Sequence, residues 1–150
     1  MKEMIFQLIS GTVGSFGFSL IFNVGKKHLI PAALGGLISW AVYLLCNRLL
    51  NMDMLMSSVL ASACCQVYAE ILARVFKTPT TVFFIPAVVP LIPGGSLYNT
   101  MYSAVFQDWS SFRVYGINTL LTTLGISIGL SFVSAVLYIV AKVSYKKAIK

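Results

Sequence analysis

The second half of the chain holds an apolar stretch that prolines and glycines interrupt, and this stretch limits most strongly how the chain can fold. Pro86, Pro90 and Pro93 are followed directly by Gly94 and Gly95. Each proline removes a backbone donor and clashes with the preceding helical turn, so we expect a broken helix. Inside a bilayer an unpaired backbone group costs several kcal/mol, so such a break persists only where protein packs around it or where it lines a wet cavity.

The composition of the whole chain places it among membrane proteins. Hydrophobic residues make up 58% of its 150 residues and charged residues only 10%, which does not fit a soluble domain. A span needs roughly 20 residues, so the chain has room for about five crossings and almost nothing else. We therefore predict an all-α, polytopic membrane protein that forms one integral membrane domain over residues 1–150.

Five apolar segments are long enough to cross a membrane as helices. We expect them at about Met4–Val24, Leu29–Cys46, Met54–Ala73, the broken segment 79–106 and Val114–Val140, with an interfacial turn at Gln107–Arg113.

Small residues recur at helical spacing in three of these segments, where they let another helix approach closely. They are Gly11, Ser15 and Ser19 in the first segment, Gly35, Gly36 and Ser39 in the second, and Gly125 and Gly129 in the last. We therefore expect a close helix neighbour along each of these faces.

The basic residues behind the net charge of +7 lie between and after the apolar runs, so they indicate topology rather than nucleic-acid binding. With five crossings, eight of them fall on one side: Lys26, Lys27, Arg74, Lys77, Lys142, Lys146, Lys147 and Lys150. The other side holds three: Lys2, Arg48 and Arg113. A re-entrant break would instead divide them six against five. The stronger bias favours five crossings, with the N-terminus outside and the C-terminus in the cytoplasm.

The cysteines and the single histidine do not form a metal-binding pattern. Cys46, Cys64 and Cys65 lie inside apolar segments, and the adjacent pair lacks the separation that an ordinary disulfide needs. We interpret them as reduced packing residues. His28 lies in a short basic loop without a second ligand nearby, and we interpret it as an interfacial loop residue. No metal and no cofactor is expected.

Glu70 is the only acidic side chain within an apolar run. It lies four residues before Arg74, which is the favourable order for an ion pair on a helix. An ionisable group inside a membrane span also suggests a carboxylate that couples transport to proton movement. Both interpretations of Glu70 stay open.

The residues after Gly95 have the length of a half-helix, for which we expect Ser96 to be the N-cap. A helix that starts within the membrane presents unpaired N–H groups and a positive dipole end, which suit a carboxylate. Tyr98, Asn99 and Tyr102 add hydroxyl and amide groups on the first turns, and the glycines let a ligand approach the backbone. The alternative is a kink that only packs around a neighbouring helix.

The motif Phe84-Ile-Pro-Ala-Val-Val-Pro-Leu-Ile-Pro-Gly-Gly-Ser-Leu-Tyr98 resembles the proline-glycine-tyrosine signature of the threonine/serine exporter family. The likeness is to the small subunit, which corresponds to the C-terminal half of the fused exporters. The first span, ending in Phe22-Asn-Val-Gly-Lys-Lys27, and the order of five spans resemble that family too. The motif positions that match are Pro90, Pro93, Gly94 and Tyr98; Gly95, Ser96, Asn99 and Tyr102 come from the half-helix argument.

The resemblance implies a bacterial inner-membrane exporter of small carboxylate metabolites. The metabolites would be threonine and serine, or a dicarboxylate such as succinate in members with paired subunits. The likeness to the small subunit also implies a larger membrane subunit as partner. No intramembrane lysine or arginine is present to receive a second carboxylate, which favours an amino acid unless the partner supplies the cation.

Two other classes of protein compete with a transporter subunit. An enzyme needs a cluster of catalytic groups, and the chain offers only Glu70, Asp108 and His28, which are far apart in sequence, so we do not expect an enzyme. A non-transporting structural or assembly subunit would use the small-residue faces only to hold a partner, and this alternative stays open.

Overall fold

The computed structural model describes residues 2–148, and within them it is helical with no strand. The elements are α1 (Lys2–Ile21), α2 (Leu29–Leu44), the π-helical turn η1 (Leu45–Leu49), α3 (Met54–Phe76), α4 (Thr81–Val88), the short 3₁₀ helix η2 (Val89–Leu91), α5 (Gly94–Val105) and α6 (Trp109–Ala148). Lys150, which enters the charge count, lies outside the described residues. The all-α prediction is confirmed.

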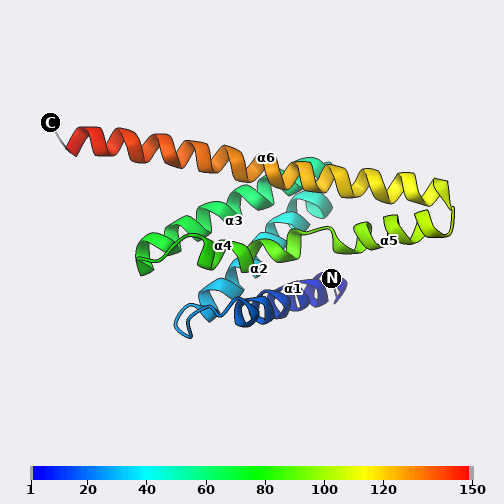
Figure 1. Cartoon of the computed structure of the whole chain (residues 1–150), viewed down its shortest axis with the longest axis horizontal. Coiled ribbons are helices and arrows are strands. Elements are labelled where there is room, and N and C mark those ends of the chain that lie inside the picture. The colour runs from blue at the N-terminus through cyan, green and yellow to red at the C-terminus, as the bar shows by residue number, and fades with distance from the viewer. Residues whose placement is uncertain (1, 149–150) are drawn as a thin grey trace.

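Four helical segments are each long and apolar enough to cross a membrane, namely α1, α2 with η1, α3 and α6. A fifth candidate is α4 with η2 and α5, which together pass the same test but bend by 51° at the break, as a broken span or a re-entrant loop does. Figure 1 shows α4 and α5 continuing in the same overall direction across the bundle, and α6 running back beside them. The expected count of about five spans, one of them broken, therefore agrees with the fold.

The predicted interfacial turn at Gln107–Arg113 is wrong for most of its length, because α6 already begins at Trp109. Asp108 acts as its N-cap. The Asp108 carbonyl accepts the N–H of Phe112 at 2.9 Å, and its carboxylate accepts the Ser111 N–H at 3.2 Å and the Ser110 hydroxyl at 2.7 Å. These bonds satisfy donors that a helix start leaves free, so the helix can begin immediately after Asp108.

Two glycines allow α3 and α6 to pack closely against each other. A Cβ on Gly125 would lie 2.6 Å from the carbonyl oxygen of Leu55 and 2.8 Å from Cβ of Ser58. A Cβ on Gly129 would collide with the hydroxyl of Ser62. The predicted close neighbour of this face is therefore confirmed, and only glycine allows the two backbones to come so near.

Helix α2 lies in the middle of the bundle because its small residues face two neighbours. A Cβ on Gly36 would collide with Ser15 of α1, and one on Gly35 would lie 2.6 Å from Cβ of Ala87 in α4. Ser15 and Ser19 are fully buried on the face that α1 turns towards α2. Both predicted small-residue faces in the first two spans therefore pack against helices.

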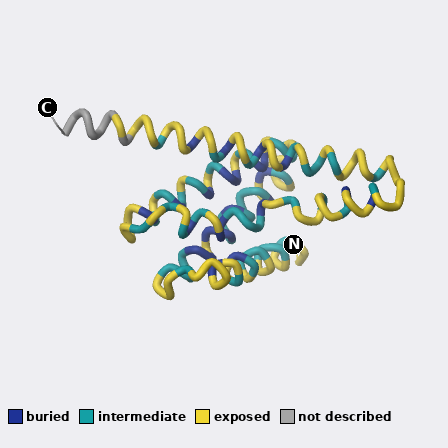
Figure 2. The backbone as a smooth tube through the Cα atoms, viewed as in Figure 1, coloured by how far each residue is buried: buried dark blue, intermediate teal, exposed yellow. Residues whose placement is uncertain are grey.

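The buried core lies where α2, α3 and α4 meet, around Ala32, Ala69, Ala73 and Phe83. Figure 2 shows buried residues gathered there, while the outer faces of α1, α5 and α6 are largely exposed. Those outer faces carry many large apolar side chains, as expected where a surface meets lipid rather than water.

Of the cysteines, Cys46 and Cys65 are buried as expected, whereas Cys64 faces outward; all three are free thiols.

Candidate functional site

The break in the fourth span consists of two residues that leave the helical conformation. Ile92 is extended, with ψ of 124°, and Pro93 has ψ of 55°. The carbonyl of Pro93 accepts the N–H of Leu97 at 2.9 Å, so Pro93 is the N-cap of α5. The prediction of Ser96 as the N-cap is therefore wrong by three positions. A helix can restart as soon as the backbone returns to helical angles, which happens directly after Pro93.

The first turn of α5 presents free backbone donors. The N–H of Gly94 bonds to the carbonyl of Ile92 at 2.7 Å, but those of Gly95 and Ser96 have no hydrogen-bond partner among the described residues. A Cβ on Gly94 or Gly95 would meet no atom within 4 Å, so this backbone borders open space. Two free donors at a helix start, without side chains to shield them, can bind an anion.

These donors border a pocket of about 240 Å³ between four helices, which we name the break pocket. Residues 90–96 form one wall, and α2, α3 and α6 supply Trp40, Tyr43, Met54 and Thr122. Five of the eight predicted substrate-binding residues therefore line one cavity: Pro90, Pro93, Gly94, Gly95 and Ser96.

The other three predicted residues lie further along α5, outside the lining of this pocket. Tyr98 and Tyr102 are 67% and 51% exposed, and their rings stack at 6.2 Å on the outer face of the helix. The opposite face, with Thr100 and Ser103, is buried. Because α5 packs mainly on α6, its tyrosines are turned outward. A substrate contact by Tyr98, Asn99 or Tyr102 stays a prediction.

A second cavity, of about 330 Å³, lies on the α1 side of the break, and Trp40 and Pro90 line both cavities. Gln7 and Gly11 are among the α1 residues in its lining. The side-chain oxygen Oε1 of Gln7 and the indole Nε1 of Trp40 are both buried without a hydrogen-bond partner among the described residues. A buried polar atom without a partner is unfavourable, so both atoms can bind a polar ligand or water.

Sequence reasoning missed these contributions from the other helices. Gln7 carried a signal, because an amide within an apolar span is costly to bury and marks a functional position. Trp40, Tyr43 and Thr122 carried none, since their residue types are common in membrane helices and only the tertiary arrangement brings them to the break.

One hydrogen bond holds α2 against the broken helix. The hydroxyl of Ser39 donates to the carbonyl oxygen of Ala87 at 2.7 Å, just before η2. Both residues are fully buried. The expectation that surrounding protein satisfies the interrupted backbone is thus met at this carbonyl.

Glu70 lies near the start of α4, at the opposite end of that helix from the break. Its Oε1 accepts bonds from Nε and Nη2 of Arg74 at 3.3 and 3.2 Å, and its Oε2 accepts the Thr80 hydroxyl at 2.9 Å. The predicted ion pair is confirmed, and the extra bond ties the end of α3 to the start of α4. Glu70 does not line the break pocket, and its role as a candidate coupling carboxylate stays a prediction.

Comparison with known proteins agrees with this arrangement of helices. Residues 7–136 match the family model described as Threonine/Serine exporter, ThrE. No solved structure matches the chain. The match takes in the whole broken span and most of the other helices, including Gln7, Trp40 and residues 90–96 around the two cavities. Proteins of this family are membrane transporters rather than enzymes. Because the match covers most of its length, this chain is a multi-pass membrane protein that belongs to the threonine/serine exporter family.

Proposed function

We propose that the chain is a subunit of a secondary transporter that exports small carboxylate metabolites across the bacterial inner membrane. The substrate is threonine or serine, or alternatively a dicarboxylate such as succinate. The observation that carries this proposal is the pair of free N–H groups of Gly95 and Ser96 at the start of α5, which border the break pocket.

The break pocket supplies the groups that a carboxylate needs. Its oxygens can accept hydrogen bonds from the Gly95 and Ser96 backbone, where the dipole of α5 adds positive potential. Trp40 lines this pocket, and its indole N–H, which has no partner among the described residues, is a third candidate donor. In low-dielectric surroundings such bonds are stronger than in water, so a small anion can be held without a fixed cation.

The backbone around the break favours an amino acid over a dicarboxylate. No lysine or arginine lines the break pocket, so this chain has no cation for a second carboxylate there. The carbonyls of Pro90 and Leu91 accept no backbone hydrogen bond among the described residues, and carbonyl oxygens suit an ammonium group. A dicarboxylate would need a cation from a partner subunit.

The resemblance to the small-subunit type supports a larger membrane subunit as the partner. The outward aromatic row of α5 is compatible with such a contact, because Tyr98 and Tyr102 are more than half exposed and carry hydroxyl groups that lipid tails cannot satisfy.

The bias of eight basic residues against three supports an N-terminus outside and a cytoplasmic C-terminus. A fusion reporter that fluoresces only in the cytoplasm should therefore be bright at the C-terminus.

The deciding experiment replaces Gly95 with leucine. A Cβ at Gly95 meets no atom within 4 Å, so Gly95→Leu should insert and fold normally while the larger side chain blocks the free N–H groups. Threonine, serine and succinate are measured in medium and cytosol of cells that express the chain with its partner. We expect export to be lost. The matched control is Gly14→Leu on α1, which also borders open space and should export normally.

Two results would contradict the proposal. Normal export by Gly95→Leu would exclude the break pocket as the substrate site. Loss of export that always accompanies loss of the partner from the membrane would favour the structural or assembly subunit instead.

A coupling role for Glu70 is tested separately with Glu70→Gln. Glutamine keeps an oxygen for the Thr80 hydroxyl but cannot exchange a proton at neutral pH. If Glu70 couples export to protons, the variant should export at a rate that no longer depends on the pH gradient. An unchanged dependence would leave Glu70 with a structural role only, through its bonds with Arg74 and Thr80.

A further inference from the structure

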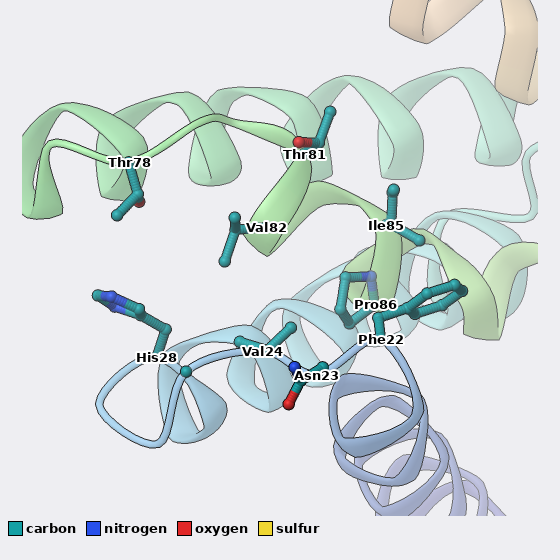
Figure 3. Close-up of a pocket in the computed structure, with 10 residues that line it drawn as sticks. Phe22, Asn23, Val24, His28, Thr78, Thr81, Val82, Ile85 and Pro86 are labelled. Carbon is teal, nitrogen blue, oxygen red and sulfur yellow. The ribbon is translucent and has the colours of Figure 1, made fainter.

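A separate cavity of about 290 Å³ lies beside the first part of α4, between the turn that joins α1 to α2 and the segment that joins α3 to α4 (Figure 3). We name it the loop pocket. Its apolar walls include Phe22, Val82, Ile85 and Pro86. Its volume is near the lower end of the range for small-molecule sites, which is roughly 300 Å³, so a small metabolite fits.

Two polar atoms of this lining are buried without a hydrogen-bond partner among the described residues, Nδ1 of His28 and Oγ1 of Thr78. His28 occupies the N-cap position of α2, yet its side chain makes no capping bond. Buried polar atoms in native proteins nearly always have partners, so these two indicate a bound water or ligand.

The imidazole of His28 is held in place by two aromatic rings. Phe76 and Phe83 contact it edge-on, with ring centroids 5.0 and 5.5 Å away. His28 is thus partly buried, in the turn before α2, where an interfacial loop residue was expected. Figure 3 shows His28 and Thr78 on one side of the cavity and the apolar side chains of Ile85 and Pro86 on the other.

The charge around the loop pocket favours an anion. None of its lining residues is acidic. Lys26, Lys27 and Lys77 lie next to the lining residues in sequence and are exposed, which raises the local concentration of small anions. Glu70, the nearby acid, already accepts bonds from Arg74 and Thr80.

We propose that the loop pocket is a second binding site for a small carboxylate, distinct from the break pocket. The carboxylate oxygens accept hydrogen bonds from the Thr78 hydroxyl and from His28 when Nδ1 carries the proton, and a short aliphatic part contacts Val82 and Ile85. The class of ligand rests on the proposed function. Pro86 lines the loop pocket and Pro90, one turn further along, lines the break pocket, so the broken helix links the two sites.

His28 is the only histidine in the chain, so it can report on the site directly. The full chain, purified through a tag without histidine and labelled with ¹⁵N-histidine, is placed in lipid nanodiscs and titrated with L-threonine, L-serine or succinate. Sodium chloride at matched ionic strength is the control. We expect a saturable shift of the imidazole resonances with at least one carboxylate and none with chloride.

Two variants separate this site from the break pocket. Thr78→Val should weaken the apparent affinity about tenfold, because a hydrogen bond to a charged group is lost. The matched control is Thr119→Val, whose hydroxyl is exposed and bonds within its own helix. Gly95→Leu should lose export and still give the saturable shift.

The outcomes distinguish the two proposals. A shift that never saturates, or one that Thr78→Val leaves unchanged, overturns the loop site and assigns the two polar atoms to water. A shift that disappears in Gly95→Leu also overturns it, because His28 would then be reporting on the break pocket. A saturable shift in a chain that exports none of the three probes supports the loop site and removes the proposed function.

Discussion

The hydroxyl of Ser39 and the carbonyl oxygen of Ala87, 48 positions apart in the chain, are joined by a hydrogen bond of 2.7 Å. This bond fixes α2 against the broken helix two residues before the 3₁₀ segment η2. Trp40, the next residue of α2, lines both cavities at the break. The same part of α2 therefore holds the interrupted backbone and contributes to the candidate site.

Replacing Ser39 with alanine should destabilise the chain by about 1 kcal/mol. The substitution leaves the buried carbonyl of Ala87 without this donor, and side-chain hydrogen bonds inside membranes contribute about 0.6 kcal/mol on average and up to about 1.7. The free energy of unfolding in mixed micelles measures the effect. Ser127→Ala is the control, because the Ser127 hydroxyl is exposed and bonds only within α6. Equal stability of the two variants would contradict a stabilising role for the bond from Ser39 to Ala87.

Adding a single methyl group to Gly125 should disrupt the contact between α3 and α6. Its Cβ would lie 2.6 Å from the Leu55 carbonyl oxygen, and overpacking of this kind costs about 1–3 kcal/mol. Gly17→Ala, where a Cβ meets no atom within 4 Å, should leave stability unchanged or slightly higher. Thermal unfolding of the two variants side by side measures the difference. If Gly125→Ala is as stable as Gly17→Ala, the close α3–α6 packing is wrong.

The N-cap of α6 should make a pH-dependent contribution to stability. Hydrogen bonds from Ser111 and Ser110 lower the pKa of Asp108 from 3.8 to about 2. A carboxyl group whose pKa is lower in the folded than in the unfolded state stabilises the fold when it is ionised. This stabilisation is fully present above the unfolded pKa of about 4, and it is lost as the pH falls through the folded pKa of about 2. The melting temperature of wild type should therefore fall further across that interval than that of Asp108→Asn, in which a neutral amide keeps the cap. Parallel curves would contradict the assignment.

Trp40 should sense substrate at the break. The chain has two tryptophans, Trp40 and Trp109, so Trp109→Phe leaves Trp40 as the single indole fluorophore. Binding of threonine or serine in the break pocket should then change the emission in a saturable way. Trp40→Phe keeps an aromatic ring beside Tyr43 but removes the indole donor, and it should raise the KM for export several-fold. An unchanged KM would exclude this donor from substrate binding.

The positions of the spans, the break and the glycine face of α6 could be predicted because each leaves a local signal in the sequence. Apolar length marks a span, proline removes a donor, and glycines four apart mark a close helix contact. The start of α5 was misplaced because it depends on the backbone angles of Ile92 and Pro93 rather than on the preference of Ser96 for N-caps. The predicted turn before α6 was too long because Asp108 caps the helix immediately.

The direction in which side chains point could not be read from the sequence. Tyr98 and Tyr102 follow the break closely, but α6 covers the opposite face of α5 and leaves both rings outside the break pocket. Conversely, Gln7 and Trp40 are distant in sequence and reach the break only because α1 and α2 pack beside η2. The candidate site is thus partly encoded in one motif and partly assembled by tertiary contacts.

Helix α6 has 40 residues, and at 1.5 Å per residue it is about 60 Å long, roughly twice the thickness of the hydrocarbon core. Figure 1 shows its C-terminal end extending past the rest of the bundle. One continuous helix therefore connects the buried contact at Gly129 to a segment that lies beyond the rest of the bundle. A rod of this kind transmits rotation and tilt along its axis, so a label attached near its C-terminal end would register movements of α6 against α3 at a distance from their contact.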